Sequence, residues 1–88
     1  MTNIKILNYN AESFDTGCAI EDVDHIEVSV ISGDELIDIH LKNGDTRFFD
    51  SADLADNRRI YGFYDGSYTV TSKNLERWNK RKSSYDLY

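Results

Sequence analysis

Three closely spaced β-hairpin signals constrain the fold of this chain more than any other feature of its sequence. The dipeptides Gly33-Asp34, Asn43-Gly44 and Asp65-Gly66 are of the kinds favoured in two-residue hairpin turns. The segments around them alternate apolar and polar residues, and alternation with a period of two is typical of strands that bury one face. The sequence therefore predicts a mainly β fold, with a three-stranded meander over 26–50 and a further hairpin over 59–71.

Two-residue turns also determine which residues lie opposite each other on neighbouring strands. In the meander they predict Val28 opposite Ile39, and Ile39 opposite Phe48, on the face that packs into the core. In the later hairpin they predict Phe63 opposite Tyr68. Both turns of the meander, chosen independently, place nearly every aliphatic side chain on the same face. This agreement supports the prediction of each turn.

The other face of the predicted meander is polar, with some apolar side chains. It carries the row Glu27–His40–Arg47, in which a carboxylate, an imidazole and a guanidinium are neighbours. We interpret this row as a cross-strand charge ladder with a structural role, and a pH switch is the alternative. Apolar residues on this face need another element or a partner to cover them; they are Ile31, Leu36 and Phe49.

The remaining segments predict four further features. We expect a strand over Asn3–Tyr9, a loop over Asn10–Gly17 and a short helical turn or a loop over Ser51–Asn57, with Ser51 as a candidate N-cap. A C-terminal helix of about 73–82 follows, with basic residues in its last turn, where they favour the helix dipole.

These elements predict one domain spanning 1–88. Leu75 and Trp78 are three residues apart in the predicted helix, so both can dock on the core. Gly62, inside a predicted strand, indicates a bend or the close approach of another segment. The expected architecture is a twisted antiparallel sheet of five or six strands, open or curled into a small barrel, with one short helix.

Composition limits the classes to which the protein can belong. A chain of 88 residues that is 40% hydrophobic and 30% charged can form one modest core, without a deep enclosed cavity. Its single cysteine, Cys18, cannot form an internal disulfide. The sequence has no apolar run long enough for a signal peptide or a membrane span, so we expect a cytoplasmic protein without membrane contact.

No constellation of residues indicates catalysis. Cys18 with His25 or His40 is the one nucleophile–base pair available, and nothing in the sequence orients it. A lone cysteine is more often a small buried hydrophobic residue. The spacing of His25 and His40 does not match a zinc motif. We therefore expect no catalytic residues, no cofactor and no metal site, and predict that the protein is not an enzyme.

Charge is distributed unevenly along the chain. Residues 1–57 contain thirteen acidic and three basic residues, a formal charge of −10, whereas residues 58–88 contain three acidic and seven basic residues, a charge of +4. An acidic surface is able to occupy the Lys- and Arg-lined groove of a nucleic-acid-binding protein. The candidate partner-binding residues are Asp22, Asp24, Glu27, Asp34, Glu35 and Asp38, with Phe49 as an apolar anchor.

The basic C-terminal helix offers an alternative binding surface. Its cations surround Trp78 and could hold phosphates while the indole stacks on a base; they are Lys73, Arg77, Lys80, Arg81 and Lys82. In this alternative the chain is a small nucleic-acid-binding protein, or a phage structural or accessory protein. Because the rest of the chain is strongly acidic and repels phosphate, we do not favour direct binding to nucleic acid.

A short, acidic, cysteine-poor chain without enzyme motifs resembles the small phage-encoded inhibitors, among them anti-CRISPR and DNA-mimic proteins. The resemblance is one of size and charge over the whole chain, and no motif carries it. It implies a non-enzymatic inhibitor in the host cytoplasm that blocks a basic nucleic-acid-processing protein, such as a CRISPR effector. It assigns no particular site residues, and a homodimer is compatible with it.

Overall fold

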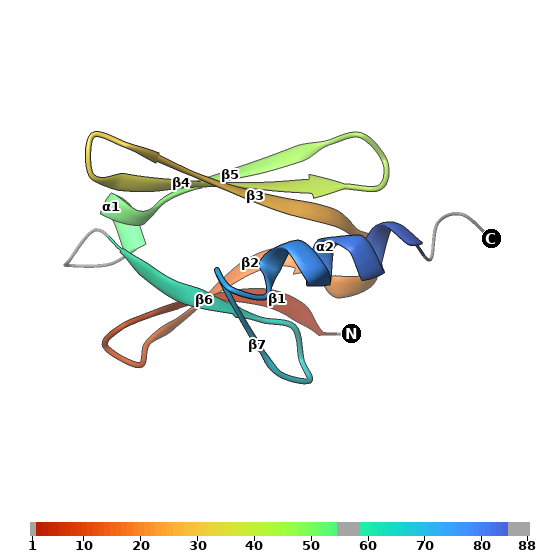
Figure 1. Cartoon of the computed structure of the whole chain (residues 1–88), viewed down its shortest axis with the longest axis horizontal. Helices are drawn as coiled ribbons and strands as arrows, with labels where there is room; N and C mark the ends of the chain where they lie inside the picture. The colour runs from red at the N-terminus through yellow and green to blue at the C-terminus, as the bar shows by residue number, and fades with distance from the viewer. Residues whose placement is uncertain (1, 55–58, 85–88) are drawn as a thin grey trace.

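The computed structural model describes residues 2–54 and 59–84, with side chains as far as residue 82, and its strands form two antiparallel sheets (Figure 1). The first sheet has the order β2(Ser13–Ala19)-β1(Asn3–Asn8)-β6(Ile60–Tyr64)-β7(Thr69–Thr71). The second has the order β3(Val23–Ile31)-β4(Asp34–Leu41)-β5(Thr46–Asp50). The predicted mainly β class is confirmed. The strands are divided between two sheets, which do not close into a barrel within the described residues.

The core lies between the two sheets, and short elements join them (Figure 1). The 3-10 helix η1(Ile20–Asp22) leads from β2 to β3, and α1(Ser51–Leu54) follows β5 on the way back to β6. Both sheets supply fully buried aliphatic side chains, as alternating strands should. The buried apolar residues are Ile4, Ile6, Cys18, Val23, Ile26, Ile37, Ile39, Ile60, Phe63, Val70 and Trp78.

The C-terminal helix α2(Leu75–Ser84) is confirmed, and it begins at Leu75, two residues later than predicted. Trp78 is 3% exposed, and its indole Nε1–H donates to Asp65 Oδ2 at 3.0 Å. Asn79 accepts a hydrogen bond from Ile26 N–H (2.9 Å) and donates one to Ile26 O (2.8 Å), as a neighbouring strand would. The helix is therefore fixed to both sheets through Trp78 and Asn79.

The first hairpin of the meander has a different turn from the predicted one. Ser32 and Gly33 are the central residues, with φ values of 52° and 85°, and positive φ at both positions defines a type I′ turn. The turn precedes the predicted Gly33-Asp34 by one residue, so Val28 lies opposite Ile37 and not Ile39. The predicted register is wrong, but a shift of two residues preserves the faces of the strands.

The second hairpin places the side chains of β5 on the faces opposite to those predicted. Three residues, 42–44, form the loop: Leu41 N–H donates to Asp45 O at 2.8 Å, Gly44 N–H donates to Leu41 O at 3.0 Å, and Gly44 has a φ of 96°. This loop is one residue longer than the predicted two-residue turn, so the register shifts by one. Phe49 therefore packs against the core, whereas Phe48, predicted to be buried, is exposed.

The third hairpin also departs from prediction. Asp65 Oδ1 accepts hydrogen bonds from Ser67 N–H (2.8 Å) and Tyr68 N–H (2.9 Å), and a loop over 65–68 results. Phe63 therefore lies opposite Val70 and not Tyr68. The close approach predicted at Gly62 is confirmed, because a Cβ there would lie 2.5 Å from Val70 O.

The predicted loop over Asn10–Gly17 is wrong in its second half, where β2 begins at Ser13. Buried Asn8 holds the turn before it, since its Oδ1 accepts from Asn10 N–H (2.9 Å) and Glu12 N–H (3.0 Å). Although β2 buries Thr16 and Cys18, it also contains Asp15 and Gly17, which are residue types depleted in strands, so its sequence signal is weak.

The helical turn predicted at 51–57 is confirmed for α1, and its last residues lie outside the described part of the chain. Ser51 does not cap it, because the side chain is buried and its Oγ accepts a hydrogen bond from Glu35 N–H at 2.8 Å. Asp50 accepts from Ala52 N–H at 2.9 Å. The predicted capping contact is therefore made one residue earlier.

Candidate functional site

The outer face of the β3–β4–β5 sheet, which points away from the core, is acidic. The pairing of the strands places four carboxylates there: Glu27, Asp34, Asp38 and Asp50. None of the side chains that these strands direct to this face is lysine or arginine. Glu27 lies directly opposite Asp38. Facing like charges weaken a strand pair by a few tenths to about 1 kcal/mol, so the arrangement does not serve the stability of the sheet.

Apolar side chains lie among these carboxylates. Phe48, directly opposite Asp38, is 73% exposed, and Ile31, at the end of β3, is 56% exposed. An exposed aromatic ring surrounded by charge is typical of an anchor residue at a protein interface. We call Glu27, Asp34, Asp38, Asp50, Phe48 and Ile31 the acidic face.

The structure brings together part of the predicted acidic set. Glu27, Asp34 and Asp38 lie on the acidic face. Asp22, in η1, and Asp24, at the start of β3, lie beside it. Glu35 and Phe49 do not belong to this surface, because their side chains point to the interior. The exposed phenylalanine is Phe48, which was missed because the length of the Lys42–Gly44 loop reverses β5.

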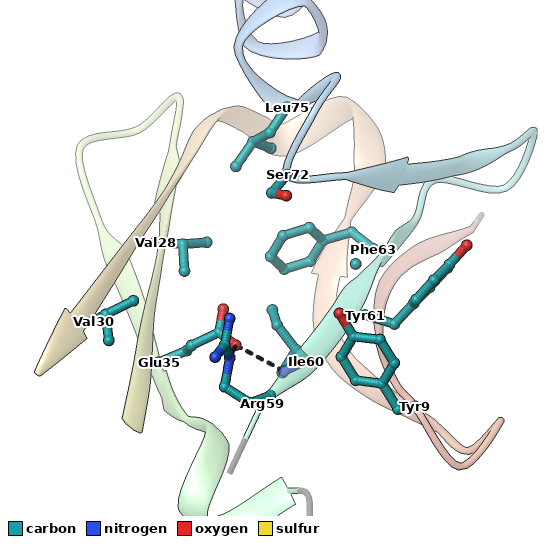
Figure 2. Close-up of a pocket in the computed structure, with 11 residues that line it drawn as sticks. Tyr9, Val28, Val30, Glu35, Arg59, Ile60, Tyr61, Phe63, Ser72 and Leu75 are labelled. Carbon is teal, nitrogen blue, oxygen red and sulfur yellow. Dashed lines mark hydrogen bonds and ion pairs between the residues drawn. The ribbon is translucent and has the colours of Figure 1, made fainter. Parts of the chain in front are cut away.

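Glu35 joins the two sheets. It is 9% exposed, and its Oε1 accepts hydrogen bonds from Arg59 Nε at 2.9 Å and from Ile60 N–H at 3.0 Å (Figure 2). The pair lies in a cavity of about 370 Å³ between β3, β4 and β6, with apolar walls that include Val28 and Phe63 (Figure 2). Glu35 therefore has a structural role at the point where strands of different sheets meet.

The cations of α2 are partly engaged in packing. The Arg81 guanidinium lies 5.3 Å from the centre of the Tyr68 ring, and Lys82 Nζ donates to Ile20 O at 2.7 Å. Lys80 lies 3.6 Å from Glu76 on the same helix. Lys73 and Arg77 are exposed. The indole of Trp78 is buried, so it cannot stack on a nucleic-acid base as the alternative binding surface requires.

The predicted row Glu27–His40–Arg47 is correct in its first pair. His40 Nε2 lies 2.6 Å from Glu27 Oε1, but Thr46 takes the place of Arg47, with its Oγ1 3.2 Å from His40 Nδ1. Cys18 is buried in the core on β2, whereas His25 and His40 lie on the outer side of the other sheet. The structure therefore does not assemble the nucleophile–base pair considered from the sequence.

Comparisons with protein-family models, with curated proteins and with solved structures gave no match to this chain. Among the described residues, no helix has both the length and the apolar character that a membrane span requires. Inference about function therefore rests on the geometry of the surface.

Proposed function

We propose that this protein is a non-enzymatic binding module whose acidic face docks on a basic, nucleic-acid-binding surface of another protein and blocks it. The observation that carries the proposal is the acidic face itself, where four carboxylates share one side of the sheet with exposed Phe48 and the three strands direct no lysine or arginine to that side. A surface with one sign of charge attracts a partner with the opposite sign.

In this mechanism the carboxylates take the place of phosphates. Asp34 and Asp38 lie four residues apart on one face of β4, about 13 Å along the strand, which is about two intervals on the scale of the spacing between backbone phosphates. Asp34, Asp38 and Asp50 would meet lysine and arginine side chains, and Phe48 would enter an apolar pocket between them. Nucleic acid is then excluded because its site is occupied.

The contacts of α2 favour the acidic face over the basic helix. Trp78 is buried, and Arg81 and Lys82 lie against aromatic rings of the same chain. A phosphate backbone approaching Lys73 and Arg77 would also meet the field of a protein with a net charge of −6. Direct binding of nucleic acid through α2 remains the competing hypothesis.

Inhibition of purified nucleic-acid-processing proteins tests the proposal. The panel consists of guide-loaded CRISPR effectors and restriction endonucleases, and DNA binding by each is measured with and without the full chain. We expect at least one member to lose DNA binding in the presence of the protein. The inhibition should weaken as salt rises, since the field of exposed charges is screened over about 8–10 Å at 0.1–0.15 M salt. A positive gel shift with DNA alone, and no inhibition across the panel, would contradict the proposal.

The Phe48→Ala variant examines the apolar anchor. Because the ring is 73% exposed, its loss should leave the free energy of unfolding unchanged within about 0.5 kcal/mol. Loss of a central anchor should weaken inhibition by roughly tenfold or more. Tyr64→Ala is a control that removes a less exposed aromatic side chain (36%) from the other sheet, and it should leave inhibition unchanged.

A further inference from the structure

We propose that His25, Glu27 and His40 form a binding site for a zinc ion at one end of the β3–β4–β5 sheet. The inference does not depend on the proposed function, because it concerns the coordination chemistry of three side chains of this chain. Two imidazoles and a carboxylate are a ligand set that zinc commonly takes in proteins.

The backbone brings the three residues together. His25 lies directly opposite His40 on β4, and Glu27 is the next residue of β3 on the same face. The register shifts between Val23 and His25, which indicates a β-bulge at Asp24. Bulges bend a strand and redirect side chains, and they occur often beside functional sites. The two imidazole rings stack with their centres 4.3 Å apart.

The distances between the potential ligand atoms suit one small ion. His25 Nε2 lies 3.5 Å from Glu27 Oε1, His40 Nε2 lies 2.6 Å from the same oxygen, and all the ligand atoms lie within 4.8 Å of one another. Tetrahedral zinc with bonds of 2.0–2.2 Å separates its ligands by about 3.4 Å. Small rotations of these side chains would therefore bring the three atoms into coordination.

The remaining ring nitrogens already have partners of the kind found around metal-bound histidines. His25 Nδ1 lies 2.6 Å from Asp24 Oδ2, and His40 Nδ1 lies 3.2 Å from Thr46 Oγ1. A histidine that binds a metal usually donates its other N–H to such an oxygen, which fixes its tautomer and orientation. In the tautomer with a proton on Nδ1, the Nε2 lone pair of each histidine is available to a metal.

His40 Nε2 supplies an independent observation. This nitrogen is buried and makes no hydrogen bond among the described residues, although Glu27 Oε1 lies 2.6 Å from it. Two electron-rich atoms 2.6 Å apart repel each other unless a positive charge lies between or beside them. A cation bound by both atoms would remove this repulsion and satisfy the buried nitrogen.

The site lies at the surface of the protein. The side chains of His25, Glu27 and His40 are 36%, 59% and 28% exposed, although the His40 Nε2 atom itself is covered. Three protein ligands leave one tetrahedral position for water or for a group of a partner.

Zinc titration of the full chain, free of any histidine tag, tests the inference by calorimetry. We expect one ion to bind per chain. His25→Ala, His40→Ala and Glu27→Gln should each weaken binding by at least roughly tenfold, and Asp24→Asn should weaken it by about tenfold through its contact with His25. Glu21→Gln is the control: it removes an exposed carboxylate of η1 outside the site, and zinc affinity should not change.

A second measurement uses the unaltered chain, so it does not depend on the folding of any variant. In ¹⁵N NMR spectra of the histidine rings, the Nε2 signals of both His25 and His40 should move as one equivalent of zinc is added. Zinc binding that survives both histidine substitutions, ring signals that do not move, or the absence of binding would overturn the inference.

Discussion

The acidic face and helix α2 are both strongly charged, but they differ in how far their charges are available to a partner. On the acidic face, Asp38 lies beside exposed Phe48, and the β3–β5 strands direct no lysine or arginine to that side. On α2, Lys82 donates to a backbone carbonyl and Arg81 lies over Tyr68. A count of charges along the sequence therefore does not show which of them a partner can reach.

The difference has a physical origin. A sheet with one buried face directs every second side chain toward solvent, so the carboxylates on that side lie at the surface of the protein. A helix of ten residues docks through a narrow stripe, and the long stems of lysine and arginine cover the apolar surface beside it. The cations of α2 therefore contribute to packing as well as to surface charge.

Removal of the Trp78 side chain should have the largest effect on stability. We expect Trp78→Ala to lower the free energy of unfolding by about 3–5 kcal/mol, because it opens a cavity and leaves Asp65 without its indole donor. Urea unfolding followed by circular dichroism measures the change. A loss below about 1 kcal/mol would show that α2 is not a structural element, and would make its cations candidates for binding again.

Glu35 is a buried carboxylate, in contrast to the carboxylates of the acidic face. Glu35→Ala should destabilise the fold by about 1–3 kcal/mol, because Ile60 N–H is left without its acceptor. Glu35→Gln keeps an acceptor oxygen, so it should lower the free energy of unfolding by less than Glu35→Ala does. Urea unfolding of both variants provides the check. Equal stability of Glu35→Ala and the unaltered chain would return Glu35 to the list of surface residues.

Asp38 should behave in the opposite way. Asp38→Asn removes the like charge facing Glu27, so the zinc-free protein should become more stable by about 0.2–1 kcal/mol at low salt. The gain should shrink as salt is added, because the repulsion is then screened. Thermal unfolding at two salt concentrations measures it. A loss of stability at low salt would mean that Asp38 makes a favourable contact, and that the acidic face is less free than proposed.

The smallest effect is expected at Asp15, on the sheet opposite the acidic face. Hydrogen bonds from Gly17 N–H (2.8 Å) and Asn3 Nδ2 (3.0 Å), with the charge of Lys5, hold the pKa of Asp15 below its usual value. Its contribution to stability is therefore present above the unfolded-state pKa of about 3.9 and is lost as pH falls through the lower folded-state pKa. Asp15→Asn should be less stable than the unaltered chain at pH 7, and the difference should vanish in acid. A difference that does not vary with pH would exclude this charge effect.

The sequence predicted the class of fold and most of the elements because alternation and turn residues act locally. It could not predict the register, since register depends on the length and handedness of each turn. The Ser32-Gly33 turn requires a positive φ at serine, and the loop before Asp45 has one residue more than the Asn43-Gly44 signal indicates. A shift of one residue was enough to exchange Phe48 and Phe49 between surface and core.

The sequence therefore predicted that this part of the chain is rich in acidic residues, but not which of them share one surface. The positions of Glu27 and Asp38 follow from strand alternation alone. Asp34 was predicted in the turn, and the buried role of Glu35 depends on a contact with Arg59 and Ile60, which are distant in sequence. The approach of His25 to His40 depends on the bulge at Asp24, for which the sequence carries no signal.

Two matched triple variants test most directly the claim that the acidic face is the binding surface. One is Asp34→Asn/Asp38→Asn/Asp50→Asn, which leaves Glu27 and the proposed zinc site unchanged; the other is Lys73→Ala/Arg77→Ala/Lys80→Ala on exposed positions of the helix region. With an effector from the panel that the unaltered chain inhibits, and with both variants shown to be folded, the concentration needed for half inhibition is measured. The acidic-face variant should require at least roughly tenfold more protein, while the helix variant should inhibit like the unaltered chain. Undiminished inhibition by the acidic-face variant, together with loss of inhibition in the helix variant, would contradict the claim.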